Sequence, residues 1–131
     1  MREGLVPMSR PTGFPPKVRR LIMERAGIEG DWVRDEVSGM WVHVEDAQLH
    51  HRIPRGSGGS KRPEVNQSAN GLVLSPTTHY RVEVNRRDAL KKGWLISKLS
   101  VELPFSVPVL LHHGWVVLDN QGGWERTEEA A

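Results

Sequence analysis

The sequence QLHHRIPRG (residues 48–56) is followed, after a basic loop, by NGLVLSPTTHYRVEV (residues 70–84). The first segment predicts a short strand ending near Ile53. The second predicts a turn, a short buried strand and a helix. We expect Thr77 to cap this helix and Gly93 to end it. The order is therefore strand, loop, strand and helix. The first strand carries His50-His51, Asn70 precedes the second strand, and His79 begins the helix.

The histidines and the asparagine of this motif are residue types that can hydrolyse a phosphate ester. Adjacent strand residues point to opposite faces, so His50 and His51 are expected to do different work unless a twisted strand end brings both to one cleft. One imidazole can bind a metal while the other accepts a proton from water. His79 can supply a second metal ligand, and Asn70 can fix the loop through its amide. A surface histidine pair and a plain Asn-Gly turn are the alternatives for the parts taken singly.

The flanking sequence predicts an α+β fold. We expect a helix from Pro15-Pro16 to Gly27, a hairpin over 32–44, and two strands over 107–118. His112-His113 is interpreted as the turn between those two strands. The last eight residues are polar and are expected to be frayed.

Three regions follow from this pattern: a flexible basic arm over 1–14, a compact domain over 15–98, and a C-terminal β extension with a polar tail over 99–131.

Composition narrows the functional classes. The chain has 131 residues and no cysteine, which excludes disulfides and thiol chemistry. Residues 52–98 carry 10 Lys and Arg against 3 Asp and Glu, which is compatible with a polyanionic partner or a solvated surface. No apolar run approaches the roughly 20 residues of a membrane span, and no signal peptide is recognisable, so we expect a cytoplasmic protein without a membrane partner.

The ordered motif resembles the HNH endonuclease family, and most closely its small bacteriophage members. The likeness covers roughly residues 14–96 and rests on His50-His51, the Gly-rich basic loop, Asn70-Gly71 and His79. It implies a ββα-metal core, with an N-terminal helix and short C-terminal strands, and an enzyme that hydrolyses DNA phosphodiester bonds.

The resemblance also implies a role for each motif residue. His50 and His79 would bind one divalent metal, His51 would be the general base, and Asn70 would orient the base through the loop backbone. Glu83, one turn after His79, is a further ligand candidate, although an exposed residue paired with Arg86 or Arg87 is the favoured interpretation. Mg²⁺ or Mn²⁺ is expected, with Ni²⁺ and Zn²⁺ as alternatives.

Basic side chains are the expected DNA contacts. Arg52 or Arg55 would touch the scissile phosphate. The wider set of candidate DNA-binding residues is Arg52, Arg55, Lys61, Arg62 and Arg86.

One departure from the family concerns its structural zinc. Related proteins commonly carry two cysteine pairs, which here would fall near Asp31 and Arg34 and near Ser75 and Thr78. No cysteine-bound zinc is therefore expected. Packing by Trp32, Trp41 and the C-terminal strands should hold the core instead.

Two other functions are also compatible with the sequence. One is a catalytically weak DNA-binding or packaging-accessory module, and the other is an RNA-cleaving nuclease. By analogy with phage proteins, DNA and the terminase packaging machinery are the expected partners.

Overall fold

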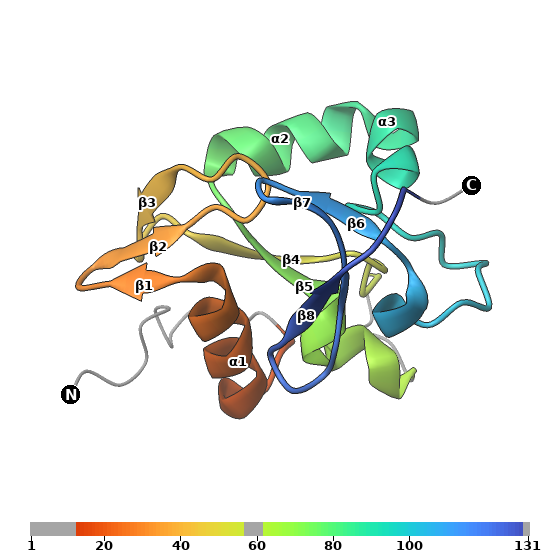
Figure 1. The fold of residues 1–131 in the computed structure, drawn as a ribbon, viewed down its shortest axis with the longest axis horizontal. Coiled ribbons are helices and arrows are strands. Elements are labelled where there is room, and N and C mark those ends of the chain that lie inside the picture. The colour runs from red at the N-terminus through yellow and green to blue at the C-terminus, as the bar shows by residue number, and fades with distance from the viewer. Residues whose placement is uncertain (1–12, 57–61, 130–131) are drawn as a thin grey trace.

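A computed structural model describes residues 13–56 and 62–129 of the chain as a mixed α+β fold (Figure 1). The described helices and strands are α1 (Pro16–Ala26), β1 (Ile28–Glu29), β2 (Trp32–Arg34), β3 (Trp41–His43), β4 (Gln48–His51), η1 (Pro63–Asn66), η2 (Ser68–Asn70), β5 (Gly71–Leu74), α2 (Pro76–Val84), α3 (Arg86–Lys91), η3 (Pro104–Ser106), β6 (Val109–Leu111), β7 (Gly114–Leu118) and β8 (Trp124–Arg126).

The centre of the fold is the antiparallel pair β4 and β5, followed by α2. Their register places His50 opposite Leu72 and His51 opposite Gly71, and α2 contacts both strands. The helix cap differs from the prediction. Ser75 has an extended backbone and its Oγ accepts from the Thr78 backbone N–H, so Ser75 is the cap and Thr77 is already inside the helix.

The predicted long helix is interrupted. Asn85 has φ −117° and ψ 58°, which ends α2 at Val84 and starts α3 at Arg86. Gly93 follows α3 with φ +75°, and a Cβ there would lie 2.0 Å from the Pro108 carbonyl oxygen. Only glycine fits this turn, which sets the course of the chain from α3 into the C-terminal region.

The N-terminal helix and the first hairpin are confirmed, with shorter strands than expected. β1, β2 and β3 form one antiparallel sheet, in which Arg34 pairs with Trp41 and Trp32 with His43. The two tryptophans do not hold the core as predicted. Trp32 is 49% exposed and Trp41 is 38% exposed, because both lie on the outward face of this sheet.

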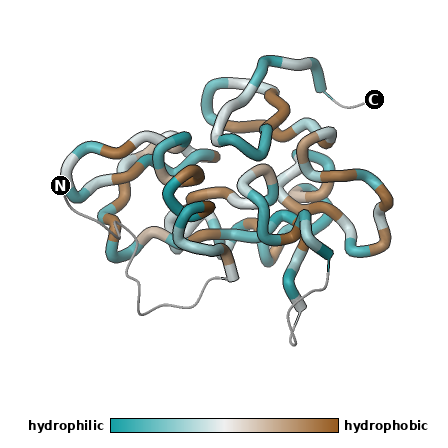
Figure 2. The backbone as a smooth tube through the Cα atoms, turned by 90° about the horizontal axis from the view of Figure 1, so that it is seen from below, coloured by the Kyte–Doolittle hydropathy of each residue, from teal (hydrophilic) through white to brown (hydrophobic). Residues whose placement is uncertain are grey.

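The C-terminal strands belong to the main core. One apolar cluster joins Leu72, Leu74 and Val82 to Val109 and Val116, among others. The apolar segments run through the middle of the molecule (Figure 2). The regions 15–98 and 99–131 therefore share a core. The prediction of a frayed end was wrong for Trp124–Arg126, which forms β8 by pairing with β7.

Two carboxylates connect the first hairpin to β5 and to the start of α2. Asp35 accepts backbone N–H bonds from Val37 and Ser38, and its other oxygen accepts the N–H of Ser75 at 2.9 Å. These bonds outweigh burial and hold the pKa of Asp35 below its usual value, although burial is the largest single influence. Hydrogen bonds of Asp35 therefore join the first hairpin to the start of α2, where the sequence predicted that packing would hold the core.

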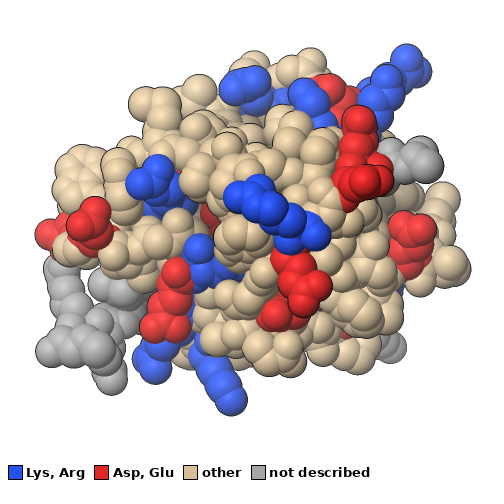
Figure 3. Space-filling view, in the orientation of Figure 1, with Lys and Arg blue, Asp and Glu red and all other residues tan. Residues whose placement is uncertain are grey.

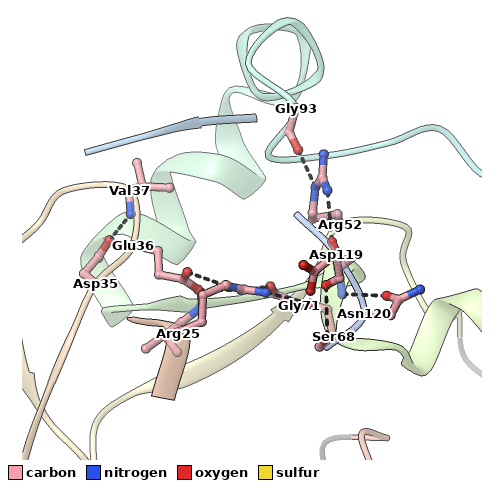
Figure 4. A network of polar contacts seen from close by, with 12 residues as sticks. Arg25, Asp35, Glu36, Val37, Arg52, Ser68, Gly71, Gly93, Asp119 and Asn120 are labelled. Carbon is pink, nitrogen blue, oxygen red and sulfur yellow. Dashed lines mark hydrogen bonds and ion pairs between the residues drawn. The ribbon is translucent and has the colours of Figure 1, made fainter. Parts of the chain in front are cut away.

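Glu36 extends this connection to α1. Its carboxylate accepts the Val73 N–H at 2.9 Å and pairs with the Arg25 guanidinium at 2.8 Å. Arg25 also donates to the carbonyls of Ser68 and Gly71 (Figure 4). Both side chains of this ion pair are almost fully buried, so they constrain α1, β5 and η2 together.

Arg52 lies in the interior, which contradicts its predicted contact with DNA. Its side chain is fully buried, and its guanidinium donates to four backbone carbonyls, at distances of 2.8–3.0 Å: Gly93, Ala69, Pro104 and Val107. Figure 4 shows the bond to Gly93. Burial lowers the pKa of Arg52 to about 9, so it stays charged at neutral pH. No local sequence pattern indicates this burial, because a basic residue beside a loop usually faces solvent.

Among the described residues, no helix combines the length and apolar character needed to cross a bilayer.

Replacing Arg52 by Met should destabilise the protein strongly. The change leaves buried carbonyls without donors, and each costs about 1–3 kcal/mol. We therefore expect the unfolding free energy in urea to fall by at least about 3 kcal/mol. Arg87→Met, on the exposed side of α3, is the matched control and should change stability little. Similar losses for the two variants would contradict the role given to Arg52.

Candidate metal centre

His50 lies in the middle of the β-strand pair and faces α2. It is 3% exposed, and its Nε2 donates to the Trp94 carbonyl at 2.7 Å. This bond leaves Nδ1 as the nitrogen with a lone pair. The His50 and His79 rings meet edge to face, with centroids 5.1 Å apart.

His79 and Glu83 reach the same point from α2. Their i,i+4 spacing places the side chains on one face of the helix, and His79 Nε2 lies 3.6 Å from Glu83 Oε1. His79 Nδ1 donates to the side-chain carbonyl of Gln48, which keeps Nε2 as the lone-pair nitrogen. The other oxygen of Glu83 lies 3.4 Å from Arg86, so the predicted pairing with Arg86 and the predicted place beside His79 both hold.

One potential ligand atom from each of His50, His79 and Glu83 lies within 4.8 Å of the others, so the three residues could hold a metal ion. Each imidazole has its second nitrogen bonded to an oxygen acceptor, an arrangement that fixes the tautomer of metal-binding histidines. Two imidazoles and one carboxylate suit a transition metal such as Mn²⁺, Ni²⁺ or Zn²⁺ better than Mg²⁺, which prefers oxygen ligands.

Both histidines of this cluster are neutral at pH 7, as ligation requires. Burial lowers the pKa of His50 from 6.5 to about 4. Burial also lowers the pKa of His79, while the Glu83 carboxylate opposes that shift. Binding a metal therefore requires no proton to be removed from either ring.

His51, at the end of β4, has different surroundings from His50. Its ring stacks on Phe14, with centroids 4.0 Å apart and 9° between the planes. Its Nε2 donates to the Asn66 side-chain oxygen at 3.1 Å, so Nδ1 is the basic nitrogen. Burial lowers the pKa of His51 to about 4, which keeps the ring neutral and able to accept a proton.

Asn70 fixes the loop that follows His51. It is fully buried, its Oδ1 accepts the Ile53 N–H at 2.8 Å, and its Nδ2 donates to the carbonyls of Ile53 and Val65. Ile53 is two residues after His51, and Val65 belongs to η1, which ends at Asn66. Asn70 therefore fixes the backbone just after His51 and that of η1 beside Asn66, while its role in orienting a base stays a prediction.

Four groups that position these side chains were missed by the sequence analysis. Gln48 precedes His50 by two residues, so strand alternation could have placed it on the same face. Asn66 and Phe14 come from distant segments, and the Trp94 group is a backbone carbonyl. None of these three contacts leaves a local pattern in the sequence.

The predicted DNA contacts are only partly accessible. Arg55 is exposed, Arg86 is exposed beside Glu83, and Arg62 bonds Glu64 at 2.6 Å. Lys61 lies outside the described residues. On the face shown in Figure 3, Lys and Arg are interspersed with Asp and Glu and form no continuous basic patch.

Metal binding should depend on Glu83 and on the hydrogen bond from Gln48. By calorimetric titration with Ni²⁺ or Mn²⁺, Glu83→Gln and Gln48→Leu should each weaken affinity by at least about tenfold, because one removes a ligand and the other frees the His79 ring. Glu24→Gln, an exposed carboxylate on α1, is the control. Unchanged affinity in Glu83→Gln would remove Glu83 from the centre.

The metal-free protein should lose stability as the pH falls from 6.5 to 4. An unfolded chain protonates His50 near pH 6.5, whereas the folded protein does so only near pH 4, so the unfolded state binds more protons in this window. At about 1.4 kcal/mol per pKa unit, His50 alone contributes on the order of 3 kcal/mol.

Urea unfolding in the presence of a chelator measures this effect. The pH dependence between 6.5 and 4 should be shallower in His50→Gln than in the parent protein. Parallel profiles for the two proteins would show that His50 is not held neutral by burial.

Comparisons with protein-family models, with curated proteins and with solved structures find no match to this chain.

Proposed function

We propose that this protein is a divalent-metal-dependent endonuclease of the HNH type that hydrolyses DNA phosphodiester bonds, with a ββα-metal core formed by β4, β5 and α2. The observation that supports it most is that His50, His79 and Glu83 bring potential ligand atoms within 4.8 Å of one another, while the residue after His50, His51, keeps a neutral ring. A cluster of potential metal ligands together with a neutral histidine points to a hydrolytic site more specifically than either feature alone.

Each residue of the proposed site has one role. His50, His79 and Glu83 hold the metal. His51 Nδ1 accepts the proton of the attacking water, while Asn66 holds the opposite nitrogen and Phe14 holds the plane of the ring. A divalent metal, when bound, offsets the negative charge that develops on the phosphate as water attacks.

Asn70 has a supporting role in this scheme. Its three bonds to Ile53 and Val65 hold the loop that leaves β4, so that His51 keeps one orientation while substrate binds. Arg55 is the cation proposed to contact the phosphate, because it is exposed and only four residues from His51. Arg52 is excluded from this task by its burial.

The choice of DNA as substrate, the phage origin and a terminase partner come from the family resemblance. RNA cleavage and a DNA-binding accessory role without turnover are the competing functions. The dispersed surface charge on the face in Figure 3 gives neither nucleic acid an advantage.

Nicking of supercoiled plasmid tests the proposal. Cleavage is expected with Mn²⁺ or Ni²⁺. His51→Ala should lower the rate by at least about 100-fold without changing metal affinity, because it removes the base and leaves the ligands. His113→Ala, from the histidine pair in the β6–β7 turn, should cleave at the parent rate.

The outcomes separate the competing functions. No cleavage by the parent protein with any divalent metal, together with retention of DNA in gel-shift assays, would favour the accessory module. Cleavage of RNA alone would favour the ribonuclease. Equal plasmid cleavage by His51→Ala and the parent would remove His51 as the base.

A further inference from the structure

A second surface of interest lies on the sheet formed by β1, β2 and β3. The pairings of Trp32 with Glu29 and His43, and of Arg34 with Trp41, put these side chains on one face, because partners in a ladder point the same way. The opposite face carries Val33, which is fully buried. Two tryptophans thus lie exposed on a sheet whose other side is core.

The two tryptophans border a hollow. It has a volume of about 370 Å³ and is lined by Glu29, Trp32 and Trp41. Trp32 is 49% exposed and Trp41 is 38% exposed. This volume is at the small end for ligand sites, enough for a side chain or a small headgroup.

Three adjacent strands line the hollow, with Trp32 of β2 between Glu29 of β1 and Trp41 of β3. Among the described residues, Glu29 makes no ion pair that would neutralise it. Trp32 and Trp41 are diagonal neighbours across β2 and β3, and the other diagonal is taken by His43 and Arg34, which contact Trp32 and Trp41 respectively. Indole faces attract cations through the negative charge of the π-system.

The neighbouring residues add negative charge. Asp31 lies in the β1–β2 turn, and Glu45 and Asp46 lie in the turn after β3; a bond from the Val44 N–H to the Asp31 carbonyl, 2.8 Å long, joins these two turns. Figure 3 shows Asp and Glu side chains at the end of the molecule where β1 and β2 lie. The Glu29 carboxylate, which lines the hollow, would repel a phosphate and attract a cation.

The same face already binds one cation. The Arg34 guanidinium lies 4.5 Å from the centre of the Trp41 ring, and its Nη1 donates to the Gly39 carbonyl at 3.1 Å. Arg34 is therefore held by its own neighbours. The hollow beside it presents Glu29 and Trp32 to a further group.

We propose that the hollow lined by Glu29, Trp32 and Trp41 binds the guanidinium or ammonium group of an arginine or lysine side chain from a basic segment of a partner protein. Glu29 accepts the hydrogen bonds of the cation, and the indole rings contact its charged face and its alkyl chain. The surface belongs to a different sheet from the candidate metal centre, so this proposal does not depend on the nuclease function.

The test follows the indole N–H signals of the ¹⁵N-labelled protein by NMR. The chain has 5 tryptophans, and substitution of each assigns its signal. The probes are a short peptide of alternating Gly and Arg, the corresponding Gly and Glu peptide, and single-stranded DNA, each at the same ionic strength. We expect the Arg peptide to shift the signals of Trp32 and Trp41 and the Glu peptide to leave them unchanged.

Three variants test the contacts. Trp32→Ala should weaken binding of the Arg peptide by about tenfold, and Glu29→Gln by about threefold. Trp124→Ala is the control, because Trp124 is exposed to a similar degree, at 39%, and lies beside Arg126 on another sheet. It should bind the peptide as the parent does.

The proposal is overturned if neither Trp32 nor Trp41 responds to the Arg peptide. It is also overturned if single-stranded DNA shifts these two signals more strongly than the peptide, which would make the hollow a base-stacking site. Unchanged peptide affinity in Glu29→Gln, a surface substitution that leaves the core intact, would equally reject cation recognition.

Discussion

The buried guanidinium of Arg52 is the constraint on which most of the structure depends. It binds carbonyls of η2, the turn after α3, and both ends of η3, and so connects β4 to segments up to 55 residues away in sequence. A buried cation is costly unless its donors are satisfied, and four carbonyls satisfy this one. The adjacent carbonyls of Gly93 and Trp94 hold Arg52 and His50 respectively. The turn at Gly93-Trp94 therefore positions both Arg52 and the candidate metal ligand His50.

A second constraint is a pair of buried carboxylates, Asp35 and Glu36, beside the first hairpin. Asp35 binds the backbone of the first hairpin and of Ser75, while Glu36 binds Val73 and Arg25. These carboxylates join α1, the first hairpin, β5 and the start of α2. Hydrogen bonds to ionised groups are stronger than neutral ones, and burial strengthens them further.

The C-terminal region also supports the candidate centre. Asn120 accepts the Ala69 N–H and donates to the side chain of Gln67, and Ser68 donates to the Asp119 carbonyl (Figure 4). These bonds fix η2, whose last residue is Asn70. Trp94 adds a bond from its indole N–H to the Leu110 carbonyl, which joins the turn after α3 to β6. A C-terminal truncation would therefore disturb the residues around His51 as well as the core.

The sequence by itself determined the local order of the central elements. Apolar alternation, Asn-Gly at 70–71 and Ser-Pro at 75–76 sufficed to predict β4, β5 and α2, because these signals act between near neighbours. The spacing of His79 and Glu83 likewise placed them on one helical face. The strand ends and the break at Asn85 were missed, since local backbone preferences there are weak and packing decides them.

Only the tertiary structure decided which charged and aromatic residues are inside. Arg52 and Asp35 are buried because distant carbonyls and N–H groups meet them, and Trp32 and Trp41 are exposed because the first sheet turns that face outward. The tautomers of His50 and His51 depend in the same way on Trp94 and Asn66, which are 44 and 15 residues away. Such contacts leave no periodic signal in a sequence. They arise when folding brings separate segments together and buried polar groups must find partners.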